Sequence, residues 1–394
     1  MAYAPDRRLS ALIFVLVTCA FATIYITQPV LPVLEAQFAI GPSTASLSVS
    51  AVIVGMAVTT LPIGMLVDRY PARRLMIAGA SIVSAAGIVC ATTPSFALLV
   101  GMRALQGAFV PTLTTCIAAW LSRTLPARAL NVAMGTYVSA TVAGGLGGRL
   151  LAGWAFPPAH WRYAFVTVAV ALFVVTLLVA PRLAEPRRTP DPRAAATPIL
   201  RLIARRPQML AQLAAFGAFG AFSTVFNYFP FYLSRAPWGL STPTITALYL
   251  VYVAGLFMGP VAGRLGDRLG NGVVMAGGAI VLMVALAATL VVAIPVLIAS
   301  LIGLCAGFFA IHAAAVGALN RGLEGERGKA NALYTLFYYV GGAIGIAAGG
   351  QLYVHLGWPG IVAVALAMAL LPFAVGVAHW RARRRGATDT QGEP

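Results

Sequence analysis

A charged turn, Gly64-Met65-Leu66-Val67-Asp68-Arg69-Tyr70-Pro71-Ala72-Arg73-Arg74, separates two long apolar runs near the start of the chain. A weaker copy, Gly263-Arg264-Leu265-Gly266-Asp267-Arg268-Leu269-Gly270, also lies between apolar runs and repeats the pattern G-x-L-x-D-R. The two aspartates are 199 positions apart, close to half of the 394-residue chain. An interval of this size predicts two related halves, because solenoid repeats are only about 20 to 50 residues long.

The composition is typical of a membrane protein. Hydrophobic residues make up 60% of the chain and charged residues 9%, which does not fit a soluble globular domain. Twelve apolar runs are long enough to cross a bilayer as helices. We therefore predict an all-α membrane protein with twelve transmembrane helices, at Leu9–Val33, Thr44–Val67, Leu75–Ala91, Ser95–Leu121, Ala129–Ala152, Tyr163–Pro181, Gln208–Leu233, Thr244–Ala262, Gly272–Ile294, Val296–Leu319, Ala330–Val354 and Gly360–Trp380.

The basic residues predict the orientation of these helices. With the N-terminus placed in the cytoplasm, all but four of the 27 Lys and Arg residues fall in cytoplasmic loops, the central linker or the tails. The exceptions are Arg103, Arg149, Arg162 and Arg235. This asymmetry predicts that both termini are cytoplasmic. It also makes the net charge of +17 a sign of topology and of contact with membrane lipids, not of nucleic-acid binding.

The charged turn resembles the signature between helices 2 and 3 of the major facilitator superfamily, G-x-x-x-D-R-x-G-R-R, although Pro71 stands at its second glycine. The resemblance implies two pseudo-symmetric six-helix bundles, residues 1–181 and 208–380. A cytoplasmic linker, 182–207, would join them. The tail, 381–394, is basic and then polar, which predicts a disordered cytoplasmic segment.

The resemblance also implies a conformational gate at the two turns. The matching residues are Gly64, Asp68, Arg69, Arg73 and Arg74 in the first copy and Gly263, Asp267 and Arg268 in the second. In the family, the aspartate of the first turn faces the N-terminal end of helix 11, whose positive dipole favours a carboxylate. Asp68 would thereby help to hold the cytoplasmic side closed.

Arg103 lies inside the fourth apolar run, about 12 Å from its outer end at 1.5 Å per residue. A guanidinium at that depth usually faces the protein interior with a partner. Arg103, Gln106 and Gly107 resemble the helix-4 signature R-x-x-Q-G of the drug:proton antiporter group, which implies a place in the binding cavity and in proton coupling. Helix carbonyls with Gln106, a water-filled cavity or the substrate are the three partners that we consider. The first two leave a positive site, which favours a neutral or anionic substrate.

His312 is the second candidate for proton coupling. It lies inside the tenth apolar run, about 24 Å from the outer end. Imidazole gains and loses a proton near neutral pH, which suits a relay, and a hydrogen-bonded packing histidine is the alternative. Because the ten acidic residues lie in loops, tails or span ends, we do not expect coupling through a carboxylate inside a span.

Two amides are matched by the half-chain interval: Gln28 in the first helix and Asn227 in the seventh. In the family, helices 1, 4, 7 and 10 line the central cavity, so the resemblance implies that these amides bind substrate or close an outer gate. Hydrogen bonding between helices is the alternative. The remaining cavity candidates are tyrosines, of which the last two share one helical face: Tyr25, Tyr228, Tyr334 and Tyr338.

Two local features affect helix geometry. Pro29 and Pro32 should bend the outer third of the first helix. The glycines in Gly144-Gly145-Leu146-Gly147-Gly148-Arg149 should let the fifth helix approach another helix closely. We expect Arg149, near the outer end of that helix, to snorkel toward the membrane surface.

The sequence favours transport over catalysis. It contains no metal-ligand spacing, phosphate-cradling loop or nucleophile–base pair, so we expect no enzyme, cofactor or metal site. We predict a monomeric secondary transporter of the bacterial inner membrane that moves a small organic compound by alternating access, with proton-coupled efflux as the first choice. Uptake or exchange of an organic anion is one alternative, and a membrane sensor or scaffold without flux is another.

Overall fold

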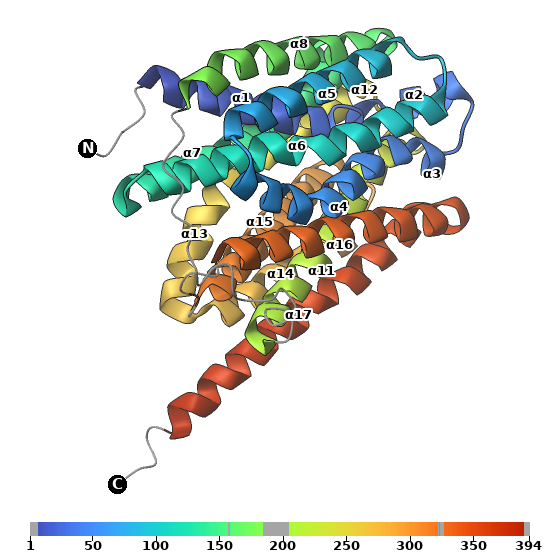
Figure 1. The fold of residues 1–394 in the computed structure, drawn as a ribbon. Helices are drawn as coiled ribbons and strands as arrows, with labels where there is room; N and C mark the ends of the chain where they lie inside the picture. Colours follow the sequence, from blue (N-terminus) through green and yellow to red (C-terminus); the bar gives the residue numbers. More distant parts are fainter. Residues whose placement is uncertain (1–6, 157, 184–204, 322, 324–326, 390–394) are drawn as a thin grey trace. The chain divides into compact units, whose positions relative to one another are not determined.

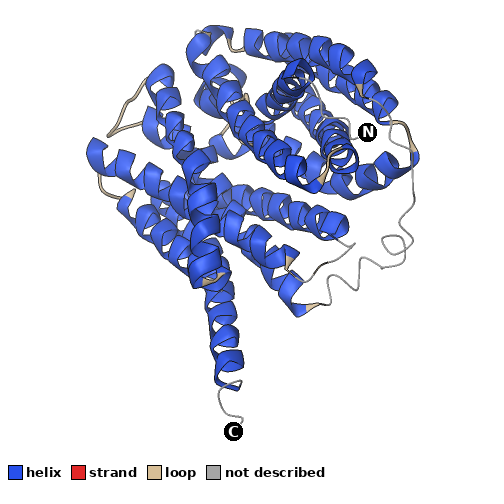
Figure 2. Cartoon of the chain, turned by 90° about the vertical axis from the view of Figure 1, so that its left-hand side faces the viewer, coloured by secondary structure: helices blue, strands red, loops and turns tan. Residues whose placement is uncertain are grey.

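The structure is a computed structural model and describes residues 7–156, 158–183, 205–321, 323 and 327–389. In this part of the chain the regular structure is helical and contains no strand (Figure 2). Eleven segments are long and apolar enough to cross a membrane. The remaining predicted span, Ala129–Ala152, forms helix α7 (Ala127–Leu150), so each predicted span corresponds to a helical segment.

The chain divides into two units. Unit 1 contains the described part of residues 1–189 together with Asn227–Leu250. Most of its helices come from the first half of the chain (Figure 1), and they are α1 (Arg7–Tyr25), η1 (Gln28–Val30), α2 (Leu31–Phe38), α3 (Pro42–Ala45), α4 (Leu47–Arg69), α5 (Ala72–Thr92), α6 (Phe96–Thr124), α7, η2 (Leu151–Ala155), η3 (Pro158–His160), α8 (Arg162–Val179), η4 (Ala180–Arg182) and α12 (Thr242–Leu248).

Unit 2 contains the described part of residues 190–226 and of residues 251–394. Its helices are α13 (Val253–Leu269), α14 (Asn271–Ala288), α15 (Ile294–Asn320), α16 (Arg327–Leu356) and α17 (Trp358–Asp389). Two elements contribute to both units: α11 (Arg206–Ser234), which passes into unit 1 at Asn227, and the 3-10 turn η5 (Tyr249–Tyr252).

The internal repeat is visible in which helices pack together. In unit 1, α4 packs against α6, and α5 packs against both α6 and α8. In unit 2, α13 packs against α15, and α14 packs against both α15 and α17. The order of these helices along each half is the same, so the half-chain repeat predicted from the two charged turns corresponds to a repeated packing pattern.

Glycines bring the fifth helix of each half against the first. A Cβ at Gly144 on α7 would overlap the carbonyl oxygen of Thr18 on α1. A Cβ at Gly341 on α16 would overlap the carbonyl oxygen of Phe216 on α11. The two glycines are 197 positions apart, and each permits a backbone approach that a side chain would block. The close approach predicted from the glycines of α7 is therefore confirmed and recurs in unit 2.

The first predicted span is interrupted where its prolines predict a bend. Helix α1 ends at Tyr25, the turn η1 follows, and α2 begins at Leu31. Because Pro29 lacks an N–H, the regular hydrogen-bond ladder cannot continue through it. The last carbonyl groups of α1 consequently need partners other than the backbone of their own helix.

Two details of the chain differ from the sequence pattern. Between α4 and α5 the turn uses Pro71 at φ −57°, whereas the matching turn in unit 2 uses Gly270 at φ 92°. The first turn therefore does not need the glycine that the signature predicts. The prediction of a disordered tail from Arg381 is wrong as far as Asp389, because α17 continues to that residue. Arginine and alanine are strong helix formers, and extending an existing helix avoids the cost of nucleation.

Candidate functional site

Arg103 on α6 is completely buried in unit 1. Its Nε donates to the carbonyl of Ser48 at 2.8 Å, and its Nη2 donates to the carbonyl of Ile24 at 2.6 Å. Its Nη1 donates to the carbonyl of Thr23 at 2.6 Å and to Oε1 of Gln106 at 2.8 Å. Thr23 and Ile24 belong to the last turn of α1. Arg103 thus caps the interrupted helix, whose C-terminal dipole also favours a cation.

The other residues of the R-x-x-Q-G pattern hold the surrounding helices around Arg103. Nε2 of Gln106 donates to the carbonyl of Val83 on α5 at 3.1 Å. A Cβ at Gly107 would overlap the carbonyl of Val52, so glycine permits the close contact between α6 and α4. Of the three partners considered for Arg103, helix carbonyls together with Gln106 are those found in this conformation.

Arg149 on α7 is a second buried arginine, with an exposed fraction of 2%. Its Nε donates to Oε1 of Gln28 at 2.6 Å, and its Nη1 donates to the carbonyl of Gly145 at 2.6 Å. The guanidinium carbon lies 4.2 Å from the ring centroid of Tyr25 and 5.1 Å from that of Tyr249. The expected snorkelling of Arg149 is wrong, because hydrogen bonds and two aromatic rings hold the guanidinium inside unit 1.

The interruption of the first span connects the two arginines. Arg103 binds the carbonyls that precede it, and Arg149 contacts Tyr25, the last residue of α1, and Gln28, the first residue of η1. Thr27 also contributes, since its hydroxyl donates to the Ser48 carbonyl at 3.5 Å, the carbonyl that Arg103 uses. The local geometry of this segment therefore depends on cations contributed by α6 and α7.

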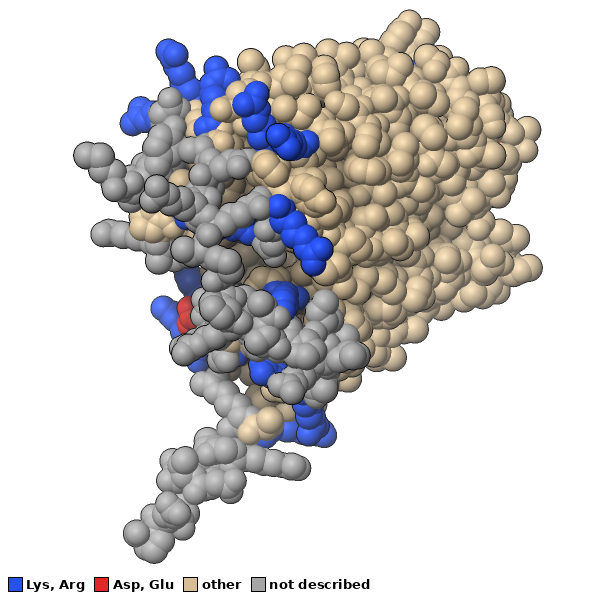
Figure 3. Space-filling model, viewed as in Figure 1, with Lys and Arg blue, Asp and Glu red and all other residues tan. Residues whose placement is uncertain are grey.

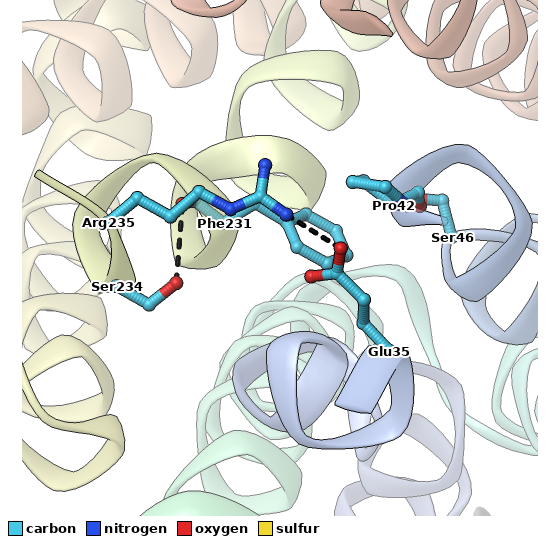
Figure 4. Close-up of polar contacts among 6 residues, drawn as sticks. All are labelled: Glu35, Pro42, Ser46, Phe231, Ser234 and Arg235. Atoms are coloured by element: carbon cyan, nitrogen blue, oxygen red, sulfur yellow. Dashed lines mark hydrogen bonds and ion pairs between the residues drawn. The ribbon is translucent and has the colours of Figure 1, made fainter. Parts of the chain in front are cut away.

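Residues from the second half of the chain complete unit 1. Tyr249 is fully buried and contacts Arg149. Thr246 on α12 is also fully buried, and a Cβ at Gly153 would overlap its hydroxyl. Glu35 on α2 also pairs with Arg235, the residue that follows α11. A carboxylate oxygen of Glu35 accepts a hydrogen bond from Nη2 of Arg235 at 2.6 Å, and the two side chains form an ion pair (Figure 4).

In unit 2, the structure brings His312 on α15 together with two of the predicted tyrosines of α16. The Nδ1 atom of His312 and the hydroxyl of Tyr334 lie 2.9 Å apart in a hydrogen bond. The ring centroids of His312 and Tyr338 are 5.6 Å apart. Tyr338 also stacks on Phe219 of α11, with centroids 3.7 Å apart and planes inclined by 12°. A titratable side chain therefore lies against an aromatic wall.

The two amides matched by the repeat have different surroundings. Gln28 is the acceptor for Arg149. Asn227 is fully buried, and both polar atoms of its side chain lack a hydrogen-bond partner among the described residues. The neighbouring Tyr228 is also buried, with its ring 6.1 Å from that of Phe231. Asn331, on the same helix as Tyr334, instead forms an amide pair with Asn320.

Comparison with known proteins identifies the family. The family model described as Major Facilitator Superfamily matches residues 13–320 and again residues 238–393. The chain belongs to the major facilitator superfamily. It is accordingly a multi-pass membrane transporter with the helical fold predicted from the sequence, and it is not an enzyme.

Individual relatives agree with this assignment. The inner membrane transport protein YnfM of Escherichia coli is 29% identical over 360 residues, which cover 90% of this chain and 86% of that protein. A chloramphenicol resistance protein of Streptomyces lividans is 30% identical over 278 residues, covering 67% and 68% of the two chains. The crystal structure of a bacterial homologue of the human lysosomal transporter Spinster, in an inward-facing and unoccupied conformation, superposes with a TM-score of 0.77 at 16% identity, covering 97% of this chain and 98% of that one.

The charged turns of this superfamily member lie at the ends of helices. In the first turn, Arg69, Arg73 and Arg74 are exposed, and the side chain of Asp68 is outside the part that the structure describes. In the second turn, Asp267 and Arg268 are exposed. The glycines Gly64 and Gly263 have open space where a Cβ would stand. On the face shown in Figure 3, Lys and Arg gather at one side, as expected when basic residues cluster at one set of helix ends.

Sequence reasoning missed Arg149, Tyr249 and the contact between Glu35 and Arg235. A signal for Arg149 was present, because ionisable residues within spans usually face the protein interior. Tyr249 gave no local signal, since it stands 100 positions from Arg149 in an ordinary apolar run.

Proposed function

We propose that this transporter exports a small organic compound across the bacterial inner membrane in exchange for protons. Both termini would lie in the cytoplasm, and the two six-helix bundles, residues 1–181 and 208–380, would alternate access to one site. The observation that carries the proton coupling is the hydrogen bond between His312 and Tyr334. No Asp or Glu lies inside an apolar span, so His312 is the side chain best suited to bind a proton near neutral pH.

The export direction is supported by relatedness to the chloramphenicol resistance protein, which makes chloramphenicol a reasonable first compound to test. The state of Arg103 argues against the alternative of organic-anion uptake, because its donors are directed at backbone carbonyls and Gln106. A buried positive charge without a carboxylate still disfavours permanently cationic substrates. A neutral substrate is therefore our first choice.

The contacts within unit 1 suggest how the outer side closes. Arg149 contacts Tyr249, and Glu35 pairs with Arg235, so residues of the first half bind residues that follow α11. Release of these contacts would accompany outward opening. At the predicted cytoplasmic side, the two charged turns would act as the gate, and exposed arginines such as Arg73 and Arg74 would contact anionic lipids. We propose a monomer as the functional unit.

Flux measurements test this function. The purified full-length protein is reconstituted into liposomes, a pH gradient is imposed, and transport is followed for a compound panel that includes chloramphenicol. We expect flux that depends on the gradient and is lost in His312→Asn, with His355→Asn as the matched control because His355 is exposed at the end of α16. A transport rate that does not change with the imposed pH gradient contradicts proton coupling. Absence of flux for every compound in the panel favours a sensor or scaffold.

A further inference from the structure

A cluster of side chains in unit 2 has the composition of a small-molecule site. It consists of Phe219 on α11, Phe308 and His312 on α15, and Tyr334 and Tyr338 on α16, and we call it the aromatic site. The Phe308 and His312 rings stack with centroids 6.0 Å apart and planes inclined by 22°. Apolar and aromatic walls with a few convergent polar groups are typical of sites for small organic ligands.

Exposure within the aromatic site is uneven. Phe219, Phe308 and Tyr334 are buried, whereas His312 and Tyr338 are half-buried. Tyr338 has its ring stacked on Phe219, which fixes its orientation. The site therefore has a rigid aromatic base and two partly accessible rings, one of which can exchange a proton.

The hydrogen bonds of His312 restrict what it can offer to a ligand. A neutral imidazole has one N–H donor and one nitrogen acceptor. The Nδ1 atom is occupied by the Tyr334 hydroxyl, and among the described residues Nε2 has no hydrogen-bond partner. If Nδ1 carries the proton and donates to Tyr334, then Nε2 presents a lone pair. Protonation converts this lone pair into a cationic N–H donor.

The hydrogen bond of His312 joins it to an uncharged side chain, that of Tyr334. Helix α13, which packs against α15, has its charged residues in its C-terminal part: Arg264, Asp267 and Arg268. Tyr334 and Tyr338 are the titratable side chains in contact with His312. Elsewhere, α14 has no charged residue, and α15 has no other titratable residue besides Cys305. On α16, the basic residues nearest in sequence to Tyr334 are Arg327 and Lys329, in the first turn of the helix. A proton bound at Nε2 thus adds a charge to a site otherwise formed by uncharged groups.

We propose that the aromatic site binds a neutral, planar aromatic compound that carries an O–H or N–H donor. The ligand ring packs against Tyr338 and His312, and its donor binds the lone pair of Nε2. A proton from water that binds Nε2 removes the acceptor and releases the ligand, so proton and ligand compete for one atom. This inference rests on the proposed exchange with protons and specifies its substrate class.

Direct binding to the detergent-purified, full-length protein tests this inference without requiring flux. The probe is radiolabelled 2-naphthol, and 2-methoxynaphthalene is the matched competitor that keeps the rings but lacks the donor. We expect saturable binding of 2-naphthol at pH 8, at least about fivefold weaker binding at pH 5.5, and about fivefold weaker competition by the methoxy compound, as expected for one lost hydrogen bond. Absence of binding, or equal affinity for the two compounds, overturns the inference.

Variants assign the effect to particular side chains. His312→Asn should abolish the difference between pH 8 and pH 5.5, while His355→Asn should keep it. Tyr338→Leu should weaken binding about two- to tenfold through loss of the stacked ring, and Tyr338→Phe should not. A pH dependence that survives in His312→Asn contradicts the proposal. If these binding results hold but vesicles show no proton-driven flux, the proposed exchange is wrong and the aromatic site still stands. If vesicles show proton-driven flux but Tyr338→Leu binds 2-naphthol as well as the parent protein does, the aromatic site is wrong and the proposed exchange still stands.

Discussion

The guanidinium of Arg149 lies 5.1 Å from the ring centroid of Tyr249, a residue 100 positions further along the chain. The opposite partner is Tyr25, at 4.2 Å. A buried cation of the first half is therefore held between a ring of its own half and a ring that follows α11. Separation of Tyr249 from Arg149 would expose a charge to water, which makes this contact sensitive to any opening of unit 1.

Loss of the Tyr249 ring should make unit 1 open more often. Thr246→Cys, with the four native cysteines replaced, provides a reporter because Thr246 is fully buried against η2. In this background we expect Tyr249→Leu to accelerate maleimide labelling about two- to thirtyfold, the range that corresponds to the loss of one cation–π contact. Tyr249→Phe keeps the ring and should label at the parental rate. Equal rates in all three proteins contradict the role of this contact.

Arg103 should behave as a structural residue. Lysine keeps the charge but cannot direct separate donors to Ser48, Thr23 and Ile24, so Arg103→Lys leaves buried carbonyls without partners. We expect the melting temperature and the abundance to fall, with a loss of at least about 2 kcal/mol in stability. Apparent substrate affinity of the surviving protein should stay the same.

The exposed Arg123, also on α6, supplies the control for Arg103. Arg123→Lys should leave thermal stability unchanged. A variant Arg103→Lys that melts normally and loses affinity would show instead that Arg103 binds the substrate.

Two adjacent glycines on α7 offer a matched test of helix packing. A Cβ at Gly148 would overlap the carbonyl of Ala22, whereas a Cβ at Gly147 would meet nothing within 4 Å. Gly148→Ala should therefore destabilise the protein by about 1–3 kcal/mol. Gly147→Ala should be neutral or slightly stabilising, since alanine is the better helix former. Thermal melting in detergent distinguishes the two, and similar melting temperatures would contradict the close approach of α1 and α7.

Gln28 and Asn227 should respond in opposite directions to replacement by leucine. Gln28→Leu removes an acceptor from buried Arg149 and should lower the melting temperature. Asn227→Leu removes a buried amide whose two polar atoms have no partner among the described residues. This replacement should raise the melting temperature, because it increases the free energy of unfolding by about 1 kcal/mol. If Asn227 binds substrate, affinity falls in the same variant. A lower melting temperature in Asn227→Leu would refute this assignment.

Local patterns in the sequence were sufficient to predict the helices, the repeat and the bend near Pro29. Each of these depends on residues close together in the chain or on a pattern repeated at fixed spacing. The contacts of Arg149 could not be predicted in this way, because distance from a helix end does not tell which side of the helix a residue occupies. Pairing of Glu35 with Arg235 joins residues 200 positions apart, close to the repeat interval, but a repeat relates equivalent positions in the two halves and does not tell that their side chains meet. The roles of His312 and Tyr334 stay predictions, although their spatial proximity is now established.

The interruption of the first span makes the two halves chemically unequal. In the second half, α11 is a continuous helix through Pro230, and the residue 199 positions after Arg103 is Ile302. A symmetrised protein assembled from two copies of the second half would keep the helix-packing pattern but would have neither the broken helix nor the arginine that caps it. Such a chain would repeat the packing of the helices and yet lack the buried cation that the interrupted helix requires. The repeat accounts for the packing of the helices, and the differences between the two halves account for the buried charge of unit 1.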